Sequence, residues 1–462
     1  MSTSIMTSVV AFIVAIGVLV TVHEFGHYWV ARKLGFKVLR FSIGFGKPLV
    51  TRVSRDPDAV EYVLAAVPLG GYVRLLDERD GPVPPQDAHR AFNRRPPVAR
   101  IAVLLAGPVA NLLFAILAYW ILLMQGIPGL KPVIGDVENG SFAAQADLRP
   151  LDEIVAVDGK ATSTRQAAVL AILEGVVAEG VVAVEVRGQG GGARKLSIRV
   201  PAGERRALTE PGTLLDGLGF SFWYPPQPVV VGELTAGMPA ERAGLAPGDR
   251  VVAMDGEPVD DYVAFVERIR GRPGQPTRLT VLRGTERREL ELELVPQPSE
   301  EDGQVIGKIG LGAAFPEDGG FPEAMRTVER YGPVAALAAA ARETWDKSAL
   351  TVRFLWRMVT GDVSTKNISG PINIAQYAGL TATEGFTYYL GFLALVSISL
   401  AILNLLPVPV LDGGQVVFQL AEMAKGAPLS AEAQLLGQKV GIAMLVALMG
   451  FAFYNDISRL FG

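Results

Sequence analysis

Residues able to perform hydrolytic chemistry occur together in His23-Glu24-Phe25-Gly26-His27, at the end of the first long apolar run. On a helix, His23 and His27 lie one turn apart on one face. Two imidazoles there can bind one zinc ion while Glu24 points toward a bound water. The alternative is a polar helix end among lipid headgroups. Ionisable side chains at the centre of a membrane span cost about 2.5–3.5 kcal/mol each, which favours the metal site.

The third protein ligand of such a zinc ion must come from a small set of residues. The chain has no cysteine and only three histidines, at positions 23, 27 and 89, so this ligand is His89 or a carboxylate. His89 lies in a Pro-rich polar stretch, residues 81–97, where a solvated loop histidine is the more ordinary interpretation. The lack of cysteine also excludes a disulfide framework and leaves the redox compartment open.

A second polar motif ends the third long apolar run, in Asn404-Leu405-Leu406-Pro407-Val408-Pro409-Val410-Leu411-Asp412-Gly413-Gly414. Pro407 and Pro409 stop the helix and expose backbone groups, which lipid does not tolerate unless protein or a water-filled cavity covers them. Asp412 is then a carboxylate at membrane depth. Asp-Gly-Gly by itself is also an ordinary turn.

Four apolar segments predict transmembrane helices, at about residues 5–30, 98–124, 388–406 and 437–454. Half of the residues are apolar and the mean hydropathy is +0.31, which is unusual for a soluble chain. The first segment lacks the basic start and small-residue cleavage site of a signal peptide, so we expect it to be retained. Residues 31–100 contain thirteen Lys and Arg against seven acidic residues. This loop is therefore predicted to be cytoplasmic, with both termini on the opposite side of the membrane.

This topology brings the two polar motifs together. The first and third spans run in the same direction, and each carries its motif at its C-terminal, cytoplasmic end. His23, His27 and Asp412 are thereby expected at one membrane depth. Two imidazoles, one carboxylate and a water form the open four-coordinate arrangement of catalytic zinc. Asn111, inside the second span, is expected to face this site or to serve plain interhelical packing.

The cytoplasmic loop, residues 36–76, contains two β-like runs, each with a pair of glycines, at Gly44 and Gly46 and at Gly70 and Gly71. Glycine allows a backbone to bend sharply or to approach another backbone closely. The two runs are either an ordinary surface hairpin or a sheet edge. Such an edge can hold an unfolded substrate strand beside the metal through main-chain hydrogen bonds.

Residues 127–316 contain an internal repeat with an offset of 97, which takes Gly135 to Gly232 and Asp152 to Asp249. Two β-rich modules are predicted, at residues 127–222 and 223–316. The second resembles PDZ domains in Gly244-Leu245-Ala246-Pro247-Gly248-Asp249-Arg250-Val251, whereas the first has Asp147 and Leu151 in place of two of these glycines. The resemblance implies a groove in which an extended peptide adds a strand. The alternative is a spacer or size filter.

The stretch after the modules, residues 320–384, is predicted to contain amphipathic helix and a connector. We expect the helix over Phe321 to Thr360, lying along the membrane surface or bracing the modules. The polar connector contains Ser369-Gly370-Pro371. Residues 385–462 then form the C-terminal membrane part, and residues 1–126 the N-terminal one.

With these motifs in place, the chain resembles the site-2 proteases, zinc metalloproteases that cut peptide bonds inside membranes. The similarity extends to Gly107-Pro108-Val109-Ala110-Asn111 and covers nearly the whole length. It implies the zinc ligands His23, His27 and Asp412, with Glu24 as general base and acid. It also implies a cleft shaped by Asn404, Pro407 and Pro409, and a membrane-embedded β-loop containing Gly44, Phe45 and Gly46.

The expected fold is a mixed membrane protein: a four-helix transmembrane metalloprotease core with a membrane-associated β-sheet, and two tandem PDZ-like α+β modules between the second and third spans. The resemblance implies cleavage of a single-span membrane protein in the bacterial inner membrane. An anti-sigma factor of the envelope stress response, or remnant signal peptides, would be the substrate. Peptide segments are the expected partners of the modules.

Two other classes of function, a scaffold and a metal transporter, are alternatives to the protease. A membrane-tethered PDZ scaffold with a structural metal site would not need Glu24 beside its ligands. A metal transporter would need ionisable residues along several spans, and the sequence shows one cluster. Nucleic acid is not an expected partner, because the formal net charge is only -4.

Overall fold

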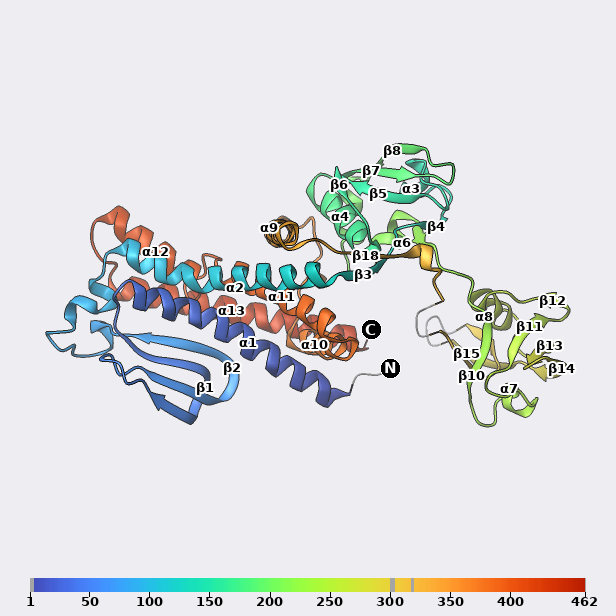
Figure 1. Ribbon diagram of the computed structural model, residues 1–462, viewed down its shortest axis with the longest axis horizontal. Helices are drawn as coiled ribbons and strands as arrows, with labels where there is room; N and C mark the ends of the chain where they lie inside the picture. The colour runs from blue at the N-terminus through green and yellow to red at the C-terminus, as the bar shows by residue number, and fades with distance from the viewer. Residues whose placement is uncertain (1–3, 300–303, 317–319, 462) are drawn as a thin grey trace.

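The computed structural model describes residues 4–299, 304–316 and 320–461. It is elongated, with a bundle of long helices and a β-hairpin at one end and two β-rich modules at the other (Figure 1). Both chain termini lie at the end of the helical part that faces the modules (Figure 1).

Four helices among the described residues are long and apolar enough to cross a membrane. They are α1 (Ile5–Lys33), α2 (Pro97–Gln125), α11 (Phe386–Asn404) and α13 (Ala431–Phe461). The predicted segments match these helices, although α13 extends several residues beyond its apolar run at both ends. Helices α1 and α11 run in one direction and α2 and α13 in the other (Figure 1). Helix α2 packs against both α1 and α11.

Small residues allow the close packing of α2 and α11. Ala115, Ala118 and Ala394 are almost completely buried in one cluster with Ile398. Helices in lipid associate mainly through such close contacts, because there is no hydrophobic driving force between them. Helix α13 lies at the periphery of the bundle. Only 11% of its apolar 18-residue stretch is buried.

The hairpin consists of β1 (Val38–Val53) and β2 (Glu61–Leu75), which lie along α1. Both strands bend, so they form a small sheet of four segments. Residues 38–43 pair with 71–75 on one side and with 61–64 on the other, and 61–64 also pair with 50–53. The segment 71–75 is therefore an edge of the sheet. The side chains of Phe45, Leu49, Val50 and Val67 are exposed, and an exposed apolar patch of this kind marks a surface that contacts protein or lipid.

The first module has its own buried core, which includes Ile134, Ile154, Ile172 and Val184. Its strands form an antiparallel sheet in the order β6-β5-β7-β8 and a separate β4-β9 pair. The elements are β4 (Ile134–Val137), α3 (Phe142–Gln145), β5 (Glu153–Val157), β6 (Lys160–Ala161), α4 (Arg165–Ala178), β7 (Val181–Arg187), β8 (Ala193–Arg199), α5 (Ala202–Leu208), α6 (Leu214–Leu218) and β9 (Phe220–Phe222).

The second module has a separate core around Val231, Val251, Leu279 and Leu294. Its main sheet has the order β14-β13-β11-β10-β17, with β12 paired to β11. The elements are β10 (Val229–Leu234), α7 (Pro239–Arg242), β11 (Arg250–Met254), β12 (Glu257–Pro258), α8 (Tyr262–Arg270), β13 (Pro276–Arg283), β14 (Glu286–Glu293), β15 (Val295–Pro298), β16 (Val305–Lys308) and β17 (Leu311–Ala313).

The internal repeat is a structural repeat. Helices α3 and α7, strands β5 and β11, and strands β6 and β12 begin and end 97 residues apart. Asp147 and Leu151 adopt positive φ angles of 62° and 68°, where the second module has Gly244 and Gly248 at 82° and 89°. The first module thus keeps the same backbone path with less suitable residues.

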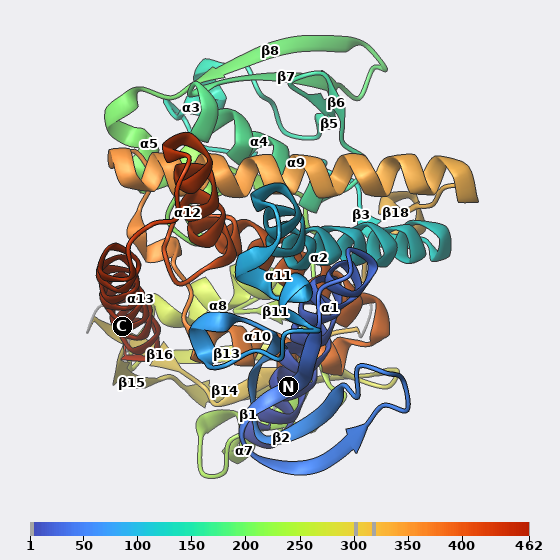
Figure 2. The same cartoon turned by 90° about the vertical axis from the view of Figure 1, so that its left-hand side faces the viewer.

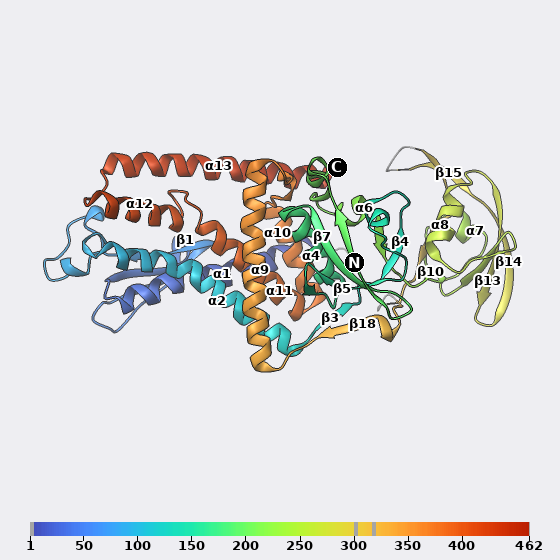
Figure 3. The same ribbon diagram turned by 90° about the horizontal axis from the view of Figure 1, so that it is seen from above.

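Helix α9 (Pro333–Thr360) lies crosswise to the long helices, between α2 and the first module (Figures 2 and 3). Lys160 of the module forms an ion pair with Asp346 of α9 at 3.1 Å. The prediction of helix from Phe321 was wrong for its first part. There the chain forms a 3-10 turn (Glu323–Met325) and β18 (Arg326–Glu329), which pairs with β3 (Ile127–Leu130). The chain returning from the modules is held beside the chain that leaves α2, and Pro333 begins the helix.

Two further helices were not predicted. One lies in the stretch predicted as a connector, and the other begins at Asp-Gly-Gly, for which an ordinary turn was the alternative. Helix α10 (Pro371–Glu384) contacts α1, α11 and α13. Helix α12 (Asp412–Lys425) follows α11 after a short turn and packs against α2. The remaining 3-10 turns are Glu78–Asp80, Ala88–Arg90, Phe92–Arg94 and Thr365–Asn367.

Candidate metal centre

Helix α1 supplies His23, Glu24 and His27, and both histidines are buried. The long apolar run from Ile5 onward forms α1. The side-chain hydroxyl of Ser4 caps the first turn of this helix by accepting the backbone N–H of Thr7. Gly26 allows α2 to come close to this part of α1. A Cβ at Gly26 would lie 2.3 Å from the carbonyl oxygen of Ala106.

Helix α2 forms the wall on which the two imidazole rings rest. A Cβ at Gly107 would lie 2.3 Å from Nε2 of His27 and 2.8 Å from Cε1 of His23, so only glycine leaves space for both rings. Nδ1–H of His27 donates to the carbonyl of Val103 at 2.8 Å. This bond places the ring proton on Nδ1 and leaves Nε2 of the neutral ring with a free lone pair.

Asn111 of α2 is fully buried, and its amide lies 3.4 Å from Nδ1 of His23. Oδ1 of Asn111 has no hydrogen-bond partner among the described residues. With the amide turned so that Oδ1 faces the ring, this oxygen accepts Nδ1–H, and Nε2 of His23 also keeps a free lone pair. Of the two expectations for Asn111, the one that it faces the site is confirmed by this contact.

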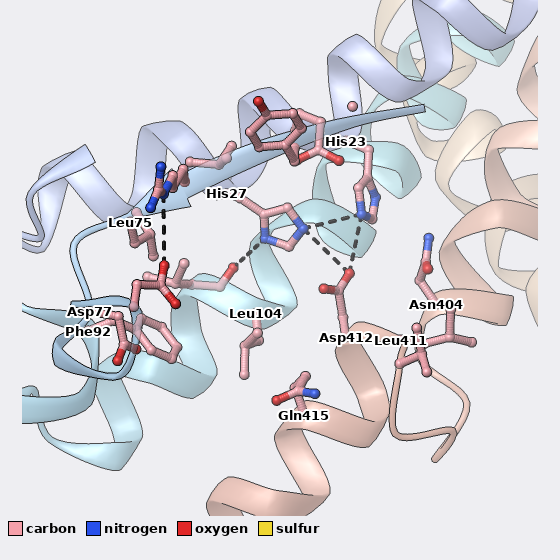
Figure 4. A pocket seen from close by; sticks show the side chains of 18 of the residues that line it. His23, His27, Leu75, Asp77, Phe92, Leu104, Asn404, Leu411, Asp412 and Gln415 are labelled. Carbon is pink, nitrogen blue, oxygen red and sulfur yellow. Dashed lines mark hydrogen bonds and ion pairs between the residues drawn. The ribbon is translucent and has the colours of Figure 1, made fainter. Parts of the chain in front are cut away.

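Asp412 is the first residue of α12, and the turn before the helix aims its carboxylate at the histidines (Figure 4). Gly413 and Gly414 make this turn possible. A Cβ at Gly413 would lie 2.3 Å from the carbonyl oxygen of Leu405, and one at Gly414 would lie 2.1 Å from that of Val408. The Asp-Gly-Gly sequence is therefore a close-packed helix start rather than a solvated turn.

His23, His27 and Asp412 converge on one point and form a group with the ligand types and spacing of a metal site. Nε2 of His23 lies 3.2 Å from Nε2 of His27 and 3.2 Å from Oδ2 of Asp412, and the third separation is 3.4 Å. Ligands about 2.0–2.1 Å from a tetrahedral zinc ion are about 3.3–3.4 Å apart. The donor set therefore fits zinc.

The electrostatics of the three atoms support the same conclusion. Oδ2 of Asp412 is buried without a hydrogen-bond partner among the residues that the structure describes. In the tautomers set by the contacts with Val103 and Asn111, it faces the unprotonated Nε2 atoms of His23 and His27. Three lone pairs directed at one another repel unless a cation lies between them.

Glu24 lines a cavity of about 690 Å³ that also contains the three candidate ligands. The sheet edge at residues 71–75 forms one wall of the cavity, and Asn404 and Gln415 lie at the side of Asp412 (Figure 4). At Gly71 the strand is so close to α1 that a Cβ would lie 2.9 Å from Cγ of Glu24. An extended chain lying in this cavity can thus meet a carboxylate, a metal-binding triad and an unpaired strand edge together.

The other predicted site residues lie at varying distances from this cavity. Among the described residues, Gly44, Phe45, Gly46, Pro407 and Pro409 do not line it. Gly44 and Gly46 have positive φ angles at the bend of the hairpin, where the Phe45 ring stacks on Tyr72. Pro409 belongs to the turn before Asp412 and accepts a hydrogen bond from Gln415 at 2.7 Å. His89 is exposed and does not belong to the metal-ligand group.

Sequence reasoning missed several residues that build the site. Val103 acts through its backbone carbonyl, which no side-chain pattern reveals. Gly107 is indistinguishable in sequence from a helix-packing glycine. The sequence did not show which of the two β-like runs forms the sheet edge at the site, and the structure places Gly71 to Leu75 along the cavity. The second glycine pair, Gly70 and Gly71, was the signal for this edge.

The model of peptidase family M50 matches residues 11–448. The regulator of sigma E protease of Salmonella typhi is 43% identical over 460 residues, covering 99% of this chain and 100% of that protein. The regulator of sigma-E protease RseP of Escherichia coli K12 is 42% identical, with the same coverage. A putative zinc metalloprotease of Vibrio cholerae is 38% identical over 459 residues, covering 99% of this chain and 100% of that protein.

Solved structures also match part of the chain. The PDZ domain of an SdrC-like protein from Listeria innocua is 22% identical, with a TM-score of 0.16. This match covers 19% of the present chain and 92% of the Listeria domain.

Proposed function

The chain belongs to peptidase family M50 and is a site-2-type zinc metalloprotease, and from this premise we propose that it cleaves single-span membrane proteins within or near their transmembrane segment. The zinc ligands in this proposal are His23, His27 and Asp412. The supporting observation is the triangle of their three ligand atoms, with separations of 3.2, 3.2 and 3.4 Å, beside the carboxylate of Glu24.

Each residue of the site has a definite task in amide hydrolysis. Bound zinc supplies a Lewis acid that polarises the scissile carbonyl and acidifies the attacking water. Glu24 accepts the proton of that water and then donates it to the nitrogen of the leaving amine. Val103 and Asn111 keep the protons of both imidazoles on Nδ1.

The substrate must present an extended backbone to these groups, because a transmembrane helix hides its carbonyls in its own hydrogen bonds. We propose that residues 71–75 hold the unwound segment by strand addition. Among the described strands, this segment pairs only with β1, and its other edge faces the cavity. The carbonyl and amide groups of the substrate are thereby aligned beside Glu24. Asn404, which lines the cavity, contacts the same segment in this proposal, and Pro407 and Pro409 shape the turn that carries Asp412.

Strand addition predicts a specific dependence on substrate amides. N-methylation of the peptide groups that flank the scissile bond removes donors while keeping the side chains. Each lost hydrogen bond should raise KM about 2- to 10-fold. Methylation at positions remote from the scissile bond serves as the control. Equal cleavage of all these peptides would refute the role of residues 71–75.

The remaining assignments concern the membrane and the substrate. Apolar helices and the relatives in Salmonella and Escherichia indicate a multi-pass inner-membrane protein. In the proposed orientation, the site lies near the cytoplasmic side, and both termini and the two PDZ-like modules are periplasmic. The relatives' name, regulator of sigma-E protease, supports an anti-sigma factor as substrate. Remnant signal peptides are a second substrate class with the same single-span form.

We further propose that the modules act as a size filter that rejects substrates with bulky periplasmic domains. Their bulk beyond the helical part supports this role (Figure 1). Deletion of residues 229–313, which contain the core of the second module, should permit cleavage of untrimmed substrates. Unchanged selection between trimmed and untrimmed substrates would contradict the filter.

The decisive experiment separates zinc binding from proteolysis. The Glu24→Gln protein should retain zinc and lose cleavage of a tagged single-span substrate, because the general base is removed while the ligands remain. The His23→Ala protein should lose both properties. Glu384→Gln, at the exposed end of α10, serves as the control. Persistent cleavage by the Glu24→Gln protein would disprove the proposed mechanism.

A further inference from the structure

A buried ion pair joins α2 to α12 away from the candidate metal ligands. Nη1 of Arg100 lies 3.0 Å from Oε2 of Glu422, and the two side chains are 10% and 7% exposed. Glu422 also accepts the backbone N–H of Leu429 at 3.3 Å. Burying two charges is expensive even when they are paired. The hydrolytic mechanism uses neither residue, so their burial needs another explanation.

On α12, Glu422 lies on the same face as Asp412. Residues 412, 415, 419 and 422 are polar and are separated by three, four and three positions, which places them along one side of the helix. Asp412 and Glu422 are about 15 Å apart along the axis, at 1.5 Å per residue. A contact at Glu422 can therefore set the rotation and tilt of the helix that begins with Asp412.

On α2, Arg100 lies on the face that orients the histidines. It is followed by Val103, Gly107 and Asn111 at spacings of three, four and four residues. Val103 holds His27, Gly107 makes room for both rings, and Asn111 faces His23. One side of α2 thus contacts both helices that carry the candidate ligands, α1 and α12.

Beyond its first turn, where Gly413 and Gly414 make close contacts, α12 buries Gln419 and Glu422 while Val417, Leu420 and Met423 are exposed. Of the two buried side chains, Glu422 is the one that forms an ion pair with α2. We propose that Arg100 and Glu422 are positioning residues, whose ion pair fixes α12 so that the Asp412 carboxylate meets His23 and His27. This inference rests on the proposed zinc site.

The test compares Glu422→Gln with a control and with a charge reversal. Glu422→Gln keeps the shape of the side chain and removes the charge that pairs with Arg100. The control is Glu78→Gln, which removes an ion pair with Arg94 whose side chains are 32% and 56% exposed. Arg100→Glu combined with Glu422→Arg restores opposite charges at the same two positions.

Three measurements distinguish positioning from general stability. Zinc affinity is measured by competition with a chelator, and kcat and KM with a single-span peptide. The chain has no cysteine, so spin labels on Leu113→Cys in α2 and Leu420→Cys in α12 report the distance between the helices. For Glu422→Gln we expect a loss of zinc affinity of about 10- to 100-fold, a lower kcat with an unchanged KM, and a broader distance distribution. The charge reversal should recover affinity and distance, and Glu78→Gln should match the wild type.

Unchanged zinc affinity and an unchanged distance in the Glu422→Gln protein would overturn the proposal. If that protein does not accumulate, Glu422→Asp takes its place, because it keeps the charge and withdraws the carboxylate by one methylene. A smaller loss of affinity is then expected, and no loss overturns the proposal. If the wild-type chain neither binds zinc nor cleaves peptide, the proposed function fails. The spin-label distance still decides separately whether the ion pair fixes α12.

Discussion

The carboxylate of Asp456, near the end of α13, accepts the backbone N–H of Gly370 at 2.8 Å, just before α10. It also accepts the N–H groups of Ile372 and Asn373, at 2.9 and 3.1 Å. Helix α10 has no side-chain cap of its own, so a residue from another helix satisfies its first donors. The neighbouring Asn455 donates to the carbonyls of Thr365 and Ile368. The most peripheral apolar helix is thereby fastened to the connector that precedes α11.

This anchor predicts a loss of stability in the Asp456→Asn protein. The asparagine has one acceptor oxygen and no charge, so buried donors at the start of α10 lose their partner. We expect a destabilisation of about 1–3 kcal/mol, measured as a lower thermal unfolding midpoint in detergent. Glu432→Gln, in the exposed first turn of α13, is the matched control. Equal midpoints for the two variants would show that the contact does not hold α13.

A second prediction concerns the close contact between Gly107 and the imidazole rings. In the Gly107→Ala protein, the new methyl group would lie 2.3 Å from Nε2 of His27, so α1 and α2 must separate or the ring must turn. Zinc affinity should fall about 10- to 100-fold, and cleavage should fall with it. Gly17→Ala is the control, because a Cβ at Gly17 has no atom within 4 Å. If both alanine variants bind zinc equally, the rings do not depend on this contact.

A third prediction uses the residues at positive φ in the first module. A left-handed conformation costs a side-chain-bearing residue about 1–2 kcal/mol, whereas glycine loses more chain entropy on folding, by about 0.5–1 kcal/mol. Leu151→Gly should therefore leave the unfolding midpoint unchanged or raise it slightly. Gly248→Leu, at the equivalent position of the second module, should lower it. A marked loss of stability in Leu151→Gly would indicate that the leucine side chain contributes more by packing than its backbone costs.

The sequence predicted those features that follow from local pattern. The apolar runs fixed the four long helices, and the direction of the first and third placed His23 and Asp412 at the same end. The offset of 97 residues recurs in the structure as equivalent helices and strands. The unpredicted elements depend on contacts between distant residues. The first turn of helix α12 contains Gly413 and Gly414, which are poor helix formers, and the helix is stabilised by its packing on α2. Strand β18 forms by pairing with β3, which lies far away in the sequence.

The position of the strand edge at the site also could not be predicted from local pattern. Gly44 to Gly46 and Gly70 to Gly71 are equivalent as local signals, since both pairs permit a bend or a close approach. Which segment becomes the edge depends on how the hairpin folds back on itself, and this is visible only in the pairing of residues 38–43 with two partners. Likewise, nothing in the sequence around Arg100 reveals that its partner is Glu422, more than three hundred positions away.

The last prediction concerns the pH dependence of the second module. Asp249 is almost fully buried, and both of its oxygens accept hydrogen bonds from Arg283, at 2.8 Å each. This guanidinium holds the pKa of the Asp249 carboxyl below its ordinary value of 3.8, against the opposing effect of burial. A carboxyl whose pKa is lowered by folding stabilises the protein above its unfolded pKa. That stabilisation is lost as the pH falls through the folded pKa.

The Asp249→Asn protein should therefore be less stable than the wild type at pH 7, by about 1.5–3 kcal/mol. The difference between the two unfolding midpoints should shrink as the pH is lowered from 5 toward 3. Glu286→Gln is the control. It removes a contact with Arg288 in which the two side chains are 64% and 41% exposed, and such surface pairs contribute little. A difference between wild type and Asp249→Asn that stays constant from pH 7 to pH 3 would contradict the assignment, because the charge of Asp249 would then have no part in holding Arg283.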